Sequence, residues 1–181
     1  MTRKLLLIGL GVGVLFAPSL AQVTIRPKPV NAVRVLCASA VAVSAAADTT
    51  ENVLATCTVP ANALGLSGTL RITTTWAYTN SANTKTLRVR YSGAAGTAFT
   101  SLAPTTTASA YLLTLITNRN ATNAQIGGAL STGLGFSASS GVAVTASVVT
   151  TADTTVVITG QKTVSGETLT LDRYLVELIV L

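Results

Sequence analysis

The sequence predicts an all-β fold, a two-sheet β-sandwich of jelly-roll type with about eight to ten strands. Three observations support this fold class. Apolar and polar residues alternate with period two over many short stretches rich in valine, threonine and aromatic residues. Turn residues separate these stretches, and few signals of helix are present. No repeat period is visible, which disfavours propellers and solenoids.

The length of the chain indicates the number of domains, and its composition indicates which partners to expect. The chain has 181 residues, 10% of them charged, and a mean hydropathy of +0.57. This length fits one domain with a tail, and so apolar a chain is unusual for a soluble monomer. The net charge is +6, or +4 without Arg3 and Lys4, and aromatic residues make up only 4%. Without a basic stripe or stacking aromatics, nucleic acid is not an expected partner.

The N-terminal part divides into two segments before the sandwich, which is expected to span 32–181. Residues 1–21 have a basic start, an apolar run and small residues before Gln22, as in a secretory signal peptide. The alternative is a retained apolar segment, and no cysteine follows that would indicate a lipid anchor. Residues 22–31, with Pro27 and Pro29, are expected to form an extended arm or linker.

The first two expected strands carry the only cysteines of the chain. Residues 32–47 alternate with Val33, Val35 and Cys37 on one face, and 51–59 place Cys57 on an inward face. A cross-strand disulfide between Cys37 and Cys57 is geometrically compatible with this arrangement. Two buried free thiols are the alternative, which a reducing compartment would favour.

The stretch Gly68–Tyr91 is expected to form a β-hairpin around the turn residues 80–85. Its first half alternates through Leu70, Ile72 and Trp76, and its second half alternates through Leu87, Val89 and Tyr91. Trp76 is the only tryptophan and is predicted to anchor the core.

Further strands are expected at 97–102, 108–117, 142–149, 154–159 and 167–181, with irregular strands in 124–138. The strands at 108–117 and 167–181 are apolar on both faces, although only one face of a sandwich strand contacts the core. The other face is therefore expected to be covered by another subunit. The predicted interface residues are Tyr111, Leu112, Leu113, Ile116, Val176, Ile179 and Val180.

Three arginines, Arg71, Arg88 and Arg90, are expected to form an outward-facing basic row across the hairpin. The row could contact an acidic partner or a cell-surface glycan. Equally, it could be ordinary surface charge that prevents strands from pairing edge to edge.

The sequence offers little for catalysis. It has no histidine, the commonest general base and zinc ligand, and its six acidic residues are scattered. We therefore expect no enzyme activity, no catalytic residues, no metal site and no cofactor. A carbohydrate-binding module that stacks a sugar on Trp76, Tyr78 and Tyr91 is a weaker alternative, because these aromatics share a face with leucine and isoleucine.

Several segments between Glu51 and Leu178 resemble structural proteins of tailed bacteriophages. In the first half of this range they are Glu51-Asn-Val-Leu-Ala-Thr, Val59-Pro-Ala, Leu64-Gly, Gly68-Thr-Leu-Arg-Ile, Trp76 and Asn83-Thr-Lys-Thr-Leu-Arg-Val-Arg. In the second half they are Asn118-Arg-Asn, Ile158-Thr-Gly-Gln and Gly166-Glu-Thr-Leu-Thr-Leu-Asp-Arg-Tyr-Leu-Val-Glu-Leu. The resemblance implies a small jelly-roll domain of a tail fibre, head fibre or decoration protein, often a homotrimer. It brings no catalytic residues, and the export-like N-terminus departs from it.

The leading hypothesis is therefore a non-enzymatic virion protein on the particle exterior, which contacts its own copies and other virion proteins. The alternative is a secreted surface-filament or adhesin subunit that uses the arm 22–31 for donor-strand exchange. In that case the chain would be extracellular.

Overall fold

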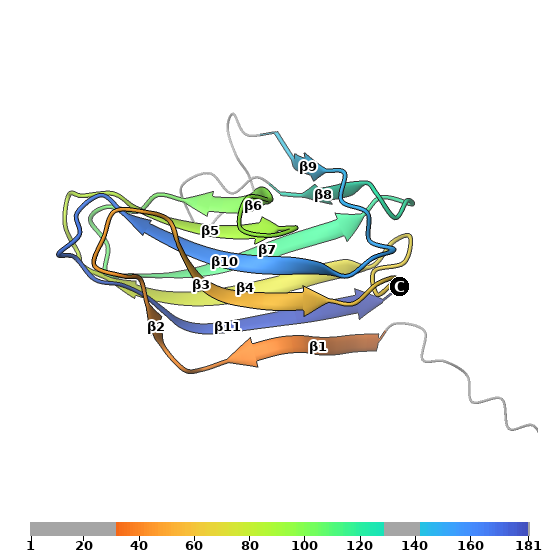
Figure 1. Ribbon diagram of the computed structural model, residues 1–181, viewed down its shortest axis with the longest axis horizontal. Coiled ribbons are helices and arrows are strands. Elements are labelled where there is room, and N and C mark those ends of the chain that lie inside the picture. Colours follow the sequence, from red (N-terminus) through yellow and green to blue (C-terminus); the bar gives the residue numbers. More distant parts are fainter. Residues whose placement is uncertain (1–31, 129–141, 181) are drawn as a thin grey trace, which may run out of the picture.

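The computed structural model describes residues 32–128 and 142–180, and the expected segments 1–21 and 22–31 lie outside the described residues. The described residues form two antiparallel sheets packed as a sandwich (Figure 1). The large sheet contains, in order, β1 (Ala32–Ser39), β11 (Leu169–Val180), β4 (Thr69–Tyr78), β7 (Ser109–Asn118), β8 (Gln125–Gly127) and β9 (Val144–Ala146), and the short β2 (Val43–Ser44) also pairs with β11. The small sheet contains β3 (Asn52–Val59), β10 (Thr154–Lys162), β5 (Lys85–Tyr91) and β6 (Thr97–Leu102).

The strand order confirms the expected jelly roll. β1 pairs with β11, β3 with β10, β4 with β7 and β5 with β6, so that early strands pair with late ones in a nested order. This nested pairing across two sheets defines the jelly roll. Among the strands in Figure 1, β1 lies at one edge of the molecule and β9 at the opposite edge.

The expected hairpin at Gly68–Tyr91 is wrong. β4 belongs to the large sheet and pairs with β7 and β11, whereas β5 belongs to the small sheet and pairs with β10 and β6. The two strands face each other across the core. Alternation identifies the face that a strand buries, but it is the same for two strands that pair side by side and for two that pack face to face.

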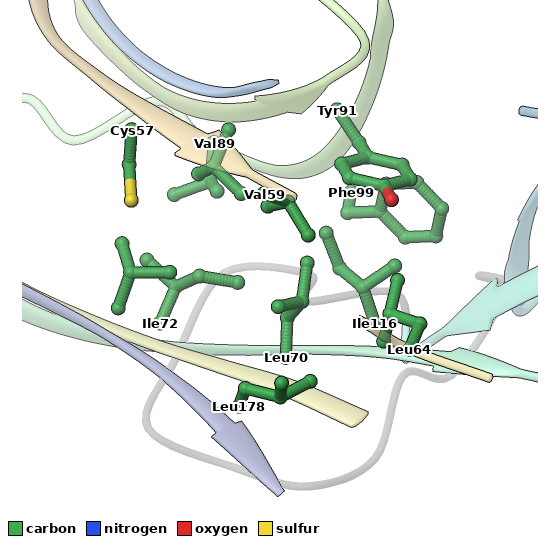
Figure 2. Packing of buried hydrophobic residues seen from close by; sticks show 12 residues of the cluster. Cys57, Val59, Leu64, Leu70, Ile72, Val89, Tyr91, Phe99, Ile116 and Leu178 are labelled. Atoms are coloured by element: carbon green, nitrogen blue, oxygen red, sulfur yellow. The ribbon is translucent and has the colours of Figure 1, made fainter. Parts of the chain in front are cut away.

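The core lies between the sheets in two clusters. In the first, side chains of the small sheet such as Val89 and Tyr91 face Leu70 and Ile116 of the large sheet (Figure 2). The rings of Tyr91 and Phe99 meet edge to face, with their centroids 6.3 Å apart. The second cluster surrounds Trp76, as the sequence predicts.

The strands differ from the expected ones in two further respects, a bulge in β1 and shorter strands after β7. In β1 the register shifts between Val35 and Cys37, so Val35 is exposed while Cys37 packs against the core. The valines and the cysteine therefore do not share a face. Of the expected strand 142–149, only β9 is formed, and the expected irregular strands in 124–138 are described only as far as β8.

A disulfide joins Cys37 to Cys57, the first of the two alternatives left by the sequence. It connects β1, at an edge of the large sheet, to β3, at an edge of the small sheet. The two sheets are thus covalently linked along one side of the sandwich.

Reduction should therefore destabilise the protein. A disulfide that closes a loop of this length contributes about 3 kcal/mol, chiefly by restricting the unfolded chain. We expect wild-type protein in reductant to melt at the same lower temperature as the variant Cys37→Ser/Cys57→Ser, and the melting temperature of the variant to be unaffected by reductant. A wild-type melting curve that does not respond to complete reduction would contradict this.

Trp76→Ala should lower the free energy of unfolding by about 3–5 kcal/mol. The indole is completely buried, and its Nε1 donates a hydrogen bond of 2.8 Å to Thr74 Oγ1. Urea unfolding followed by circular dichroism would measure the loss. An unfolding midpoint equal to that of the wild type would show that the indole is not a core residue in solution.

Candidate functional site

The outer face of the small sheet carries one exposed large apolar side chain among the described residues, Val53, and its arginines Arg88 and Arg90 are paired with Glu51. Glu51 accepts hydrogen bonds from Arg90 at 2.8 and 2.9 Å and from the hydroxyl of Thr159, and it forms a salt bridge with Arg88 at 2.9 Å. The hydrogen bond from Arg90 is the main cause that lowers the pKa of Glu51 to about 2. Such a face is suited to contact with water.

The outer face of the large sheet is different. Four large apolar side chains stand on it at more than 40% exposure: Val33 (55%) and Val35 (54%) on β1, and Tyr111 (56%) and Leu115 (42%) on β7. Half-buried apolar side chains lie between and beside them, namely Leu113, Leu175 and Ile179. Exposed apolar groups that gather on one face mark a surface of interaction.

A trough of about 420 Å³ lies in this face, above β4 and β11. Its lining residues are Arg71, Thr73, Thr75, Tyr111, Leu113, Arg173, Leu175 and Glu177. Register places Thr73 beside both Leu113 and Leu175, and Thr75 beside both Tyr111 and Arg173. Because threonine is shorter than its neighbours, β4 forms the floor, and Tyr111 and Leu115 form a ridge along β7.

An ion pair lies at one end of the trough. Arg71 Nε donates to Glu177 Oε2 at 2.7 Å, and the two residues are cross-strand neighbours on β4 and β11. This hydrogen bond lowers the pKa of Glu177 and raises the pKa of Arg71. Among the described residues, Arg173 of the same trough makes no salt bridge. Because Arg71 and Glu177 neutralise each other, the trough carries a net charge of only about one positive unit, from Arg173.

A second bulge, at Asp172 on β11, produces this face. The register with β4 shifts between Leu171 and Arg173. Before the bulge Leu171 is buried, and after it Val176 is buried, so the inward positions change from odd to even numbers. Arg173, together with Leu175 and Glu177, consequently points outward. The apolar character of β11 on both faces, which the sequence shows, arises partly from this change.

The predicted interface set is divided between the two faces of the sheet. Tyr111 and Leu113 lie on the outer face, and Ile179 has the outward parity of β11. Leu112, Ile116 and Val176 are buried in the sandwich, so these three are wrong as interface residues. Val180 is partly buried and packs against the core. Sequence reasoning missed Val33, Val35, Leu115 and Leu175, because it did not resolve the direction of each strand and the position of the bulges.

The predicted basic row is also wrong. Arg71 lies on the large sheet and pairs with Glu177, whereas Arg88 and Arg90 lie on the small sheet and share Glu51. The row depended on the hairpin, which does not form, and all three guanidinium groups have a carboxylate partner.

The aromatic residues of the sugar-stacking alternative are in the core. Trp76 and Tyr91 have no exposed surface, and Tyr78 is 5% exposed. None of the three rings is available to a sugar.

A buried pair of lysines was not expected from the sequence. Lys85 and Lys162 are neighbours on β5 and β10, and both are buried. Lys85 Nζ lies 3.1 Å from Glu167 Oε2, and Lys162 Nζ donates to the backbone oxygen of Glu167 at 2.8 Å. Hydrogen bonds from Ser81 and Asn83 help to lower the pKa of Glu167 to about 2. The cluster joins the turns at one end of the sandwich.

No group of three or more metal-binding side chains comes together within the part of the chain that the structure describes. In the same residues, no helix has the length and apolar character needed to span a membrane. The glutamates Glu51, Glu167 and Glu177 form ion pairs with arginine and lysine side chains. These ion pairs connect strands and turns of the sandwich.

Comparison with known proteins identifies no family. No family model matches the sequence, and no curated protein matches it. A structure of infectious bursal disease virus, Gx strain, is similar over 83% of this chain and 40% of that chain, at 11% identity and a TM-score of 0.25. A similarity this low carries no argument about fold or function.

Glu51→Gln should lower stability at neutral pH but not in acid. Because folding lowers the pKa of Glu51 from 4.5 to about 2, its carboxylate stabilises the fold above pH 4.5, and this stabilisation is lost as the pH falls toward 2. Loss of these charged hydrogen bonds should cost about 1–3 kcal/mol at pH 7. Urea unfolding at pH 7 and pH 2 should show the two proteins converging in acid, and an equal difference at both pH values would contradict the pairing.

Proposed function

We propose that this protein is a non-enzymatic structural subunit of a virus particle, an oligomeric jelly roll on the exterior of a tailed phage, as a fibre or decoration protein. The observation that carries the proposal is the contrast between the two outer faces. The small sheet presents paired charges around Glu51, whereas the large sheet presents exposed apolar side chains around a trough.

This contrast matches the two environments of a surface subunit. A particle protein needs one side in water and another against its neighbours, and neighbours bury apolar surface that would otherwise be exposed. The low proportion of charged residues fits the same role. The segments between Glu51 and Leu178 that resemble tailed-phage structural proteins supply the more specific assignment to a fibre or decoration, the expected trimer and the contacts with other virion proteins.

The disulfide between Cys37 and Cys57 favours a second candidate, a secreted surface-filament or adhesin subunit. Structural disulfides form in oxidising compartments, whereas virion parts of phages assemble in the host cytoplasm. In this case the mature chain would begin at Gln22 and be found on extracellular fibres. N-terminal sequencing of the native protein distinguishes the two candidates.

The full chain should sediment at micromolar concentration as an oligomer, with a native mass three times that of one chain if it forms the expected trimer and twice that mass if two copies meet through the same face. Tryptic peptides of this protein should also be present in purified virus particles from the source of the gene. A monomer in solution, together with its absence from such particles, would refute the proposed function.

A further inference from the structure

We propose that a second copy of this chain covers the outer face of the large sheet, with the β7 ridge of one copy, Tyr111 and Leu115, lying in the trough of the other. The inference rests on the proposed function and names its interface. The two shapes are complementary because the ridge has the most exposed side chains of β7, and the trough has the short threonines of β4.

The charges on the face favour a copy of the same chain. Arg71 and Glu177 neutralise each other, which leaves Arg173 as the one cation of the trough without a salt bridge among the described residues. A polyanionic partner would find little attraction here. A nearly neutral face can instead meet its own copy without strong repulsion.

The area of the face is that of a small interface between two copies. The face covers β1, β11, β4 and β7, and its outward positions run from Thr69 to Thr75 along β4. With strands about 4.8 Å apart and a rise of about 3.4 Å per residue, it measures roughly 450 Å² as a flat surface. Two such faces, the β1 valines included, bury roughly 900 Å², which is below the ~1,200 Å² at which standard interfaces begin and in the class of small interfaces.

Leu115→Asp should disrupt the oligomer, because it places a carboxylate on the ridge. The matched control is Val53→Asp, since Val53 is also an exposed apolar residue, 52% exposed, but lies on β3 of the small sheet. We expect sedimentation to show monomeric L115D and oligomeric V53D at the same micromolar concentration. Circular dichroism should show both variants folded.

Crosslinking tests the pairing directly. Ser109 lies on β7 two residues before Tyr111, and Thr73 lies on the floor of the trough. A mixture of the full-length variants Ser109→Cys and Thr73→Cys, treated with a short bis-maleimide, should give a covalent pair that joins positions 109 and 73. The control mixture pairs Ser109→Cys with Thr56→Cys, because Thr56 is exposed on the small sheet, and should give no such product.

The outcomes separate this inference from the proposed function. An oligomer that persists in L115D, or a crosslink from position 109 to position 56 and not to position 73, would refute the trough contact. The proposed function would then stand, with copies that assemble through another surface. A wild-type chain that is monomeric at micromolar concentration would refute the second copy as the occupant. If that chain is also absent from particles, the proposed function fails with it.

Discussion

The bulge at Asp172 is the local feature on which both faces of the large sheet depend. Leu169 and Leu171 pack around Trp76 before it, and Val176 and Leu178 pack against Leu70 and Ile72 after it. A regular strand would turn one of these pairs outward, because successive side chains alternate between faces. The same shift directs Arg173, Leu175 and Glu177 toward the trough, so one extra residue serves both the core and the outer face.

Alternation in the sequence predicts the all-β class, most strand positions and the burial of Trp76. It does not predict which strands pair, because pairing depends on contacts between residues far apart in the chain. The hairpin at Gly68–Tyr91 and the row of Arg71, Arg88 and Arg90 are wrong for that reason. The subunit interface stays a prediction: β7 and β11 do carry apolar residues on both faces, but assigning each residue to a face requires the bulges.

The lysine cluster shows a signal that the sequence did contain. Lys85 has the same parity as Leu87, Val89 and Tyr91, all of which are buried, so its burial follows from its position on β5. A buried ammonium needs partners, and Ser81, Asn83 and Glu167 supply them from the adjoining turns. Its partners could not be predicted, because the turn after β10 meets the turn after β4 only in the folded jelly roll.

The distribution of glutamates connects composition to assembly. All three glutamates of the chain, Glu51, Glu167 and Glu177, hold arginine or lysine side chains. Ion pairs of this kind fix local geometry but reduce the charge that keeps a surface in water. On the outer face of the large sheet, threonines of β4 lie beside leucine and tyrosine side chains of the neighbouring strands. Such a face is stabilised by contact with a matching surface, and the proposed interface assigns that surface to a copy of the same chain.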